Sequence, residues 1–285
     1  MRSPFKLRSR FNINNYSNLG QRVITALIGA TVIVFGSVYS EWSYFLIFGT
    51  ILAFSQMEFY KLSGLDGMLP LKSFGTLLGV IIFCLSFLIE MQHLQDKYYF
   101  LIFPLSSLVF FIKLYRKSDK KPFTGVAFTF LGIFYVAVPF ALLNLAAFSV
   151  DGTFHYEVIV GALFILWASD TGAYFAGTKF GKTKLFERVS PKKSWEGFLG
   201  GAILAYTVAY VLSKYFTALP EWQWFCITTI VIIAGTYGDL IESLFKRSIE
   251  IKDSGRILPG HGGFMDRFDG LLLSAPFIAA FLKIF

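Results

Sequence analysis

Apolar segments long enough to cross a lipid bilayer recur along this whole chain. About 20 apolar residues are needed to span a hydrocarbon core roughly 30 Å thick. Nine segments approach this length, of which the last is short: 22–40, 42–60, 73–91, 98–115, 124–148, 156–178, 197–216, 222–245 and 270–285. Inside a bilayer such segments satisfy their backbone hydrogen bonds as helices. The sequence therefore predicts an all-α polytopic integral membrane protein with about nine transmembrane helices.

The overall composition agrees with a membrane protein. Hydrophobic residues make up 55% of the chain and charged residues only 15%, which is unlike an ordinary soluble domain. Cys84 and Cys226 both lie in apolar runs, so we interpret them as buried apolar side chains without disulfide or zinc spacing. The first 22 residues are polar and basic, and we see no cleavable signal peptide in them.

The basic residues fall almost entirely on one side of these segments. With the N-terminus inside, the cytoplasmic parts of the chain hold five, two, five, six and five Lys and Arg in turn, which leaves Lys97, Lys214 and Lys283 outside. This asymmetry follows the positive-inside rule and predicts an N-in, C-out topology. The net charge of +8 then reflects loops facing anionic lipid, and we expect no nucleic-acid partner.

The polar chemistry is concentrated after residue 165 and on the cytoplasmic side. We therefore divide the chain into a basic cytoplasmic N-terminal segment (1–21), an N-terminal transmembrane scaffold (22–150) and a C-terminal catalytic transmembrane domain (151–285). Gln56 and Glu58 are polar exceptions near the end of a span in the first half. We interpret them as interfacial rather than catalytic.

A stretch rich in acids and bases, 243–269, lies between the apolar runs 222–238 and 270–285. Charge at the bilayer centre costs about 2.5–3.5 kcal/mol per residue on insertion scales. Asp239, Glu242, Ser243 and Lys246 lie at the start of this stretch or just before it. They share one helical face, because Glu242, Ser243 and Lys246 follow Asp239 by three, four and seven residues. Asp239 follows an apolar turn and is therefore expected to face the bundle interior, as a functional acid or as a packing partner of a lysine.

Asp266 and Asp269 are three residues apart, immediately before the last span. If a helix has begun there, they share a face and could converge with Asp239 where two spans meet. Hard oxygen ligands without His or Cys suit Mg²⁺, which completes its shell with water and substrate phosphate. The alternative is a solvated helix start, where acids are favoured.

Between these acids lies the segment PGHGG, residues 259–263. Its glycines would let the backbone approach a ligand and present N–H groups to an anion ahead of a helix N-terminus, although the segment could also be a simple turn. His261 is a candidate phosphate donor rather than a metal ligand. Acids, glycines and bases together indicate a binding site for a metal-bound polyphosphate. The bases are Lys246, Arg247, Lys252, Arg256 and Arg267.

A second polar cluster extends over 167–201. Asp170 interrupts an apolar run, and the small residues after it, Gly172, Ala173, Ala176 and Gly177, are typical of close helix packing. Ser194 is a candidate helix cap. Lys192 and Lys193 precede a helix N-terminus and could attract phosphate, or could serve as positive-inside anchors.

The stretch S-L-F-K-R-x4-K-D-x-G-x2-L-P-G-H-G-G-x2-D-R-F-D at 243–269 resembles the signature of the phosphatidate cytidylyltransferase (CDP-diacylglycerol synthase) family, without a departure. The segments SPKKSWEG at 190–197 and WASDTGAY at 167–174 are also similar to this family. The resemblance covers roughly the last 120 residues, whereas the first 150 resemble the family only in hydropathy and span count.

The resemblance implies that CTP and phosphatidic acid react to give CDP-diacylglycerol and pyrophosphate, with Mg²⁺ required and a second metal ion left open. It also implies a homodimer in the inner (plasma) membrane with the active site on the cytoplasmic face. It assigns metal binding to Asp239, Asp266 and Asp269, and catalysis to Asp239, Asp266, Lys246 and Arg247. It assigns substrate binding to Asp170, Lys192, Lys193, Glu196, Lys252, Gly260, His261, Gly262, Gly263 and Arg267.

Two other functions are compatible with parts of this pattern. A CTP-dependent lipid kinase of the polyprenol or phytol type would transfer the γ-phosphate to an alcohol. A transporter or channel would place its ionisable residues at mid-span, whereas here they gather at one face. The sequence therefore favours an enzyme.

Overall fold

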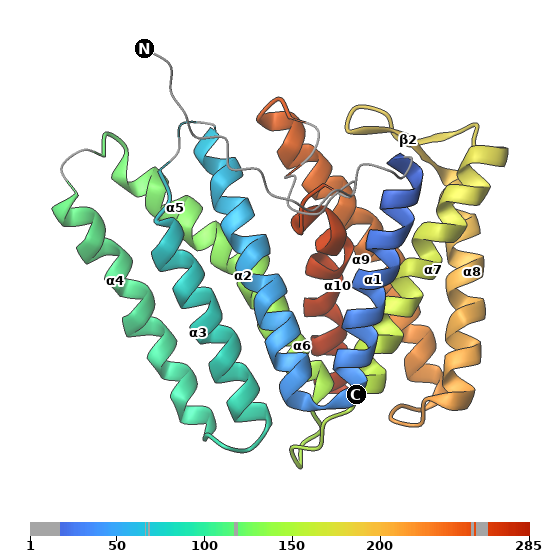
Figure 1. Cartoon of the computed structure of the whole chain (residues 1–285), viewed down its shortest axis with the longest axis horizontal. Coiled ribbons are helices and arrows are strands. Elements are labelled where there is room, and N and C mark those ends of the chain that lie inside the picture. The colour runs from blue at the N-terminus through green and yellow to red at the C-terminus, as the bar shows by residue number, and fades with distance from the viewer. Residues whose placement is uncertain (1–17, 66, 68, 117–118, 252–253, 255–261) are drawn as a thin grey trace, which may run out of the picture.

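The computed structural model describes residues 18–285 except 66, 68, 117–118, 252–253 and 255–261 (Figure 1). Long helices dominate the described chain. They are α1 (Asn18–Tyr39), α2 (Glu41–Leu65), α3 (Lys72–Glu90), η1 (Asp96–Leu101) continuing into α4 (Ile102–Tyr115), α5 (Pro122–Gly132), η2 (Ile133–Ala137), α6 (Val138–Ala147), α7 (Tyr156–Phe180), α8 (Trp195–Tyr215), α9 (Glu221–Ser248) and α10 (Met265–Ile284).

Within the described residues, six helical segments are long and apolar enough to cross a membrane. They are Lys72–Glu90, Asp96–Tyr115, Pro122–Ala147, Tyr156–Phe180, Trp195–Tyr215 and Glu221–Ser248. A shorter apolar helix covers Val23–Tyr39. The predicted class, an all-α integral membrane protein, is confirmed. Helices α2 and α10 cover two further predicted ranges, but the count of nine spans stays a prediction.

The connections predicted to be basic and cytoplasmic lie at one end of the bundle. The links α2–α3, α4–α5, α7–α8 and α9–α10 are all at the upper end in Figure 1, and the links α1–α2, α3–α4, α6–α7 and α8–α9 are at the lower end. Helices α3 and α4 form one flank, α7 and α8 form the other, and α9 and α10 lie between them.

Small residues let α7 and α8 approach closely. A Cβ on Gly172 would lie 2.6 Å from the carbonyl oxygen of Gly200, and a Cβ on Gly201 would lie 2.6 Å from that of Ser169. Since real Cβ atoms do not approach backbone so closely, any larger side chain here would separate the helices. The packing predicted for the small residues after Asp170 is confirmed.

A second close crossing joins α9 and α10. A Cβ on Gly238 would overlap the carbonyl oxygen of Asp269, and one on Gly270 would lie 3.4 Å from that of Gly235. The two backbones therefore touch one residue before Asp239 and at Asp269. This crossing decides which polar side chains of the two helices meet.

Gln56 and Glu58 are not interfacial, which corrects the sequence interpretation. Their relative exposures are 0% and 3%. The Gln56 amide donates to the carbonyl of Gly75 at 3.0 Å and to the Tyr60 hydroxyl at 3.1 Å. One face of helix α2 packs against α1, α3 and α5, so polar side chains on that face are enclosed by neighbours that hydropathy alone does not reveal.

A short antiparallel hairpin, β1 (Lys184–Phe186) and β2 (Ser190–Ser194), connects α7 to α8 and was not predicted. At its end the Gly197 N–H donates to Ser194 Oγ at 3.1 Å. Ser194 is thus the N-cap of α8, as predicted.

Candidate active site

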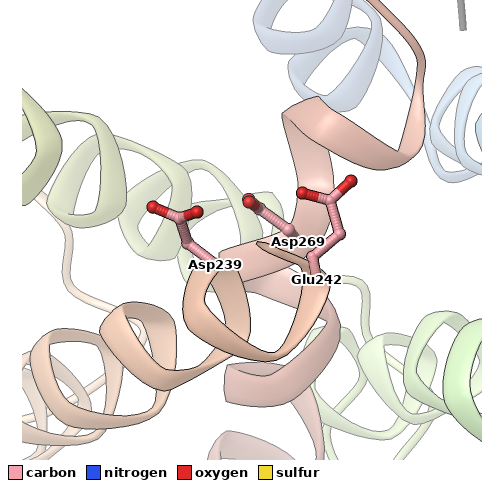
Figure 2. Close-up of side chains that lie close together, drawn as sticks. All are labelled: Asp239, Glu242 and Asp269. Atoms are coloured by element: carbon pink, nitrogen blue, oxygen red, sulfur yellow. The ribbon is translucent and has the colours of Figure 1, made fainter. Parts of the chain in front are cut away.

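Three carboxylates meet where α9 and α10 cross. Asp239 and Glu242 come from α9, and Asp269 comes from α10 (Figure 2). One oxygen from each can be chosen so that all three lie within 4.8 Å of one another. Glu242 is almost completely buried, with a relative exposure of 1%, whereas the other two are half-buried.

Two lysines form ion pairs with this group of carboxylates. Lys193 Nζ lies 2.5 Å from Asp239 Oδ2, and Lys246 Nζ lies 2.7 Å from Glu242 Oε2. Glu242 Oε1 is buried and has no hydrogen-bond partner among the described residues. An unpaired buried carboxylate oxygen is costly.

The donor set therefore fits a divalent cation. Like-charged carboxylates this close favour a positive partner, and the oxygen of Glu242 that lacks a partner would supply one ligand. An all-oxygen set without His or Cys matches Mg²⁺ better than a softer metal. Glu242 was not assigned to the site from the sequence, although its spacing from Asp239 placed both on one helical face.

Asp266 is used differently from the other acids. Its Oδ1 accepts from Lys246 Nζ at 2.7 Å, and its Oδ2 accepts from the N–H groups of Ser254 at 3.1 Å and Gly263 at 2.9 Å. Asp266 thus holds Lys246 beside Glu242 and holds the α9–α10 connection against the start of α10. Its predicted role as a metal ligand stays a prediction.

The described glycines of the PGHGG segment allow the chain to pass close to Asp266 and Glu58. Gly262 has φ +82°, a left-handed conformation that favours glycine. A Cβ on Gly263 would overlap Glu58 Oε1 and Ser254 Oγ. Gly263 presents its N–H to Asp266 of the same chain. The predicted site residues Lys252, Gly260 and His261 lie outside the described residues.

Glu58 of α2 anchors the same connection and was missed as a site residue. Its Oε1 accepts from Ser254 Oγ at 2.9 Å, and its Oε2 accepts from the Met265 N–H at 3.1 Å. A helix from the first half of the chain therefore supports the end of this connection and the first turn of α10, in which Asp266 lies. The signal in the sequence was an acid in an apolar helix, which an interfacial position explained equally well.

The second polar cluster reaches the same site. Lys193, on β2, pairs with Asp239 and also donates to the carbonyl of Thr236 at 3.4 Å. Asp170, on α7, interacts electrostatically with Asp239, Lys193 and Arg267. The structure thus brings Asp170 and Lys193 together with the carboxylates of α9 and α10.

Glu196 and Arg247, two of the remaining predicted residues, form hydrogen bonds with backbone groups. The Glu196 carboxylate accepts from the N–H groups of Lys182 and Thr183, both at 3.1 Å. Arg247 is exposed and donates to the carbonyl of Ile251 at 3.1 Å. Lys192 and Arg267 are also exposed. The predicted role of Arg247 in catalysis and those of Lys192, Glu196 and Arg267 in substrate binding stay predictions.

Carboxylates that suit a hard cation, beside lysines at one end of a bundle of membrane-length helices, are typical of membrane enzymes that act on phosphate-bearing substrates. The chain belongs to the cytidylyltransferase family, whose sequence profile matches residues 20–285. The family membership predicted from the motifs is confirmed.

The chain is similar over nearly its whole length to bacterial phosphatidate cytidylyltransferases. It is 29% identical to that of Bacillus subtilis strain 168 over 282 residues, which covers 94% of this chain and 99% of the relative. It is 33% identical to that of Staphylococcus saprophyticus over 272 residues, covering 90% and 96%. It is 30% identical to that of Haemophilus influenzae over 282 residues, covering 92% and 98%.

Proposed function

We propose that this chain is a phosphatidate cytidylyltransferase of phospholipid biosynthesis. It transfers CMP from CTP to phosphatidic acid and releases CDP-diacylglycerol and pyrophosphate. The full-length similarity to proteins of that name supports the reaction. The observation that carries the proposal is the group of Asp239, Glu242 and Asp269, with Lys193 and Lys246 paired to it.

In this proposal Asp239, Glu242 and Asp269 would hold Mg²⁺, with a second metal ion left open. When bound, the metal would screen phosphate charge and polarise the α-phosphate of CTP. Lys193 and Lys246 are positioned to attract phosphate oxygens, because each is held by an ion pair to a carboxylate of the group. Lys246 is held from two sides, by Glu242 and by Asp266.

The reaction needs little from the protein beyond positioning and charge. The attacking phosphate of the lipid is already anionic, so no protein nucleophile or strong base is required. The barrier comes from bringing one phosphate against another, and preorganised cations lower that repulsion and stabilise the leaving pyrophosphate. Lysines fixed by ion pairs to these acids are such preorganised groups.

We also propose nine membrane spans with an N-in, C-out topology, a homodimer, and a plasma-membrane location with the site on the cytoplasmic face. The position of the basic connections at the same end as the carboxylates supports this orientation. In that orientation a membrane lipid would reach the site laterally from the cytoplasmic leaflet.

The test is an assay of the purified protein with CTP labelled at the α-phosphate, phosphatidic acid and Mg²⁺. We expect the label in the lipid product, and none in lipid when Mg²⁺ is removed. Label that remains in soluble CDP would show γ-phosphate transfer to an alcohol and would overturn the proposal in favour of a lipid kinase.

A further inference from the structure

A cavity of about 700 Å³ lies between α2 and α3, near the end of the bundle that carries the site. Much of its wall is apolar, with Phe54 and Met57 from α2 and Leu77 and Val80 from α3. Several of these side chains are exposed on the outside of the bundle, Leu77 by 60%. A hydrocarbon chain could therefore enter the cavity from the surrounding lipid.

Two lysines give this apolar cavity a positive margin. Lys61, near the end of α2, and Lys72, at the start of α3, both line it and are exposed. In the part of the chain that the structure describes, neither forms an ion pair. Two exposed ammonium groups with no ion pair among the described residues, beside an apolar groove, suit an amphipathic ligand with an anionic head.

A polar atom in the wall also lacks a partner. Thr76 lines the cavity from α3, and its Oγ1 is buried without a hydrogen-bond partner among the described residues. A helical threonine ordinarily satisfies its hydroxyl with a carbonyl of the preceding turn, as Thr50 does with that of Leu46 at 2.7 Å. An unpaired hydroxyl is expected where a ligand oxygen completes the site.

The cavity borders residues that hold the end of the α9–α10 connection in place. Glu58 and Ser254 line it, and these residues are hydrogen-bonded to each other at 2.9 Å. The Ser254 N–H donates to Asp266, which in turn holds Lys246. Two residues of the cavity wall are therefore linked through Asp266 to Lys246, which pairs with Glu242 of the carboxylate group.

We propose that this cavity, the α2–α3 groove, binds phosphatidic acid as the acceptor lipid. The proposal rests on the proposed function and specifies where its lipid substrate docks. The acyl chains lie against the apolar wall, and the phosphate monoester lies on the side of Lys61 and Lys72, next to the connection that leads to the carboxylates. A phosphate monoester matches two lysines better than the diester of a bulk phospholipid does, because it carries more negative charge.

The first test is photocrosslinking from a benzophenone amino acid placed at Leu77 in the full-length protein. Radioactive phosphatidic acid should label this variant, and unlabelled phosphatidic acid should displace the label far better than equal amounts of phosphatidylcholine or phosphatidylglycerol. A matched control carries the benzophenone at Leu199 of α8, which is 59% exposed, and there all three lipids should compete alike. Equal competition at Leu77 would show a groove occupied by bulk lipid and would overturn the proposal.

The second test removes the two positive charges, in the double variant Lys61→Ala, Lys72→Ala. We expect the KM for phosphatidic acid in mixed micelles to rise roughly tenfold or more, with kcat and the KM for CTP nearly unchanged. The double variant Lys120→Ala, Lys121→Ala removes the same charge from the α4–α5 connection and should leave both KM values unchanged. An unchanged KM for phosphatidic acid, or a rise only in that for CTP, would overturn the proposal.

Failure of the proposed function gives a different result. The wild-type protein would then leave α-labelled CTP unconverted in the presence of phosphatidic acid, whatever the labelling at Leu77. Selective labelling at that position without turnover would refute the transferase reaction and retain the lipid site.

Discussion

Replacing Glu58 by Gln tests whether the first half of the chain supports the chemistry of the second. Glu58 lies on α2, far in sequence from the residues it contacts. Its two oxygens accept from Ser254 and from the Met265 N–H. Glutamine keeps the size of the side chain but removes its charge: its oxygen can still accept from the Met265 N–H and its NH₂ can donate to Ser254 Oγ, so both contacts become neutral hydrogen bonds.

The size of the effect follows from these contacts. Converting two hydrogen bonds to a charged acceptor into neutral hydrogen bonds costs about 1–3 kcal/mol. If that cost falls on the contact that holds Ser254 and the start of α10 against α2, the equilibrium between the formed and the broken contact shifts by roughly 5- to 150-fold, and kcat falls by up to that factor. The helix–helix packing of the bundle is unchanged, so the midpoint of thermal unfolding should shift little.

The measurement is kcat with α-labelled CTP and saturating phosphatidic acid, alongside thermal unfolding of the same preparation. Glu90→Gln is the matched control. The Glu90 carboxylate accepts from Lys283 at 2.9 Å, at the opposite end of the bundle, and this variant should keep its kcat. A Glu58→Gln variant with wild-type kcat would refute the reasoning, as would an equal loss in both variants.

Four further predictions concern the carboxylate group and its surroundings. Asp239→Asn and Asp269→Asn should each abolish turnover while the protein still inserts and folds, and near-normal activity at saturating Mg²⁺ would contradict the proposed metal site. Lys193→Ala should raise the KM for CTP, whereas an unchanged KM would return this lysine to membrane anchoring. Gly238→Ala should separate α9 from α10 and lower both kcat and stability, the latter by about 1–3 kcal/mol, while Gly29→Ala, whose Cβ meets nothing within 4 Å, should lower neither. Removing divalent cations with EDTA should stop the reaction and added Mg²⁺ should restore it, and activity that persists in EDTA would contradict a metal requirement.

Much of the fold could be predicted because it depends on local properties of the sequence. Helix positions followed from the length of apolar runs, since the hydrocarbon core requires a minimum length. The motifs at 243–269 and 190–197 identified the family before any geometry was known. The location of the basic connections at one end of the helix bundle followed from the distribution of lysine and arginine.

The roles of the individual acids depended on how separate helices meet. Spacing showed that Asp239 and Glu242 share a face of one helix, but it did not show that Glu242 would join Asp269 in one group or that Asp266 would turn to Lys246 and two backbone N–H groups. That choice is made at the crossing of α9 and α10, which the absence of a side chain on Gly238 permits.

The sequence by itself thus determined the membrane class, the family and the segments that carry the charge. Only the tertiary structure decided which carboxylates converge, that Lys193 on β2 reaches Asp239, and that Glu58 from α2 supports the connection. The physical reason is that hydropathy and helical periodicity describe one segment at a time. Hydrogen bonds and ion pairs between distant segments depend instead on the distance and angle at which their helices pack.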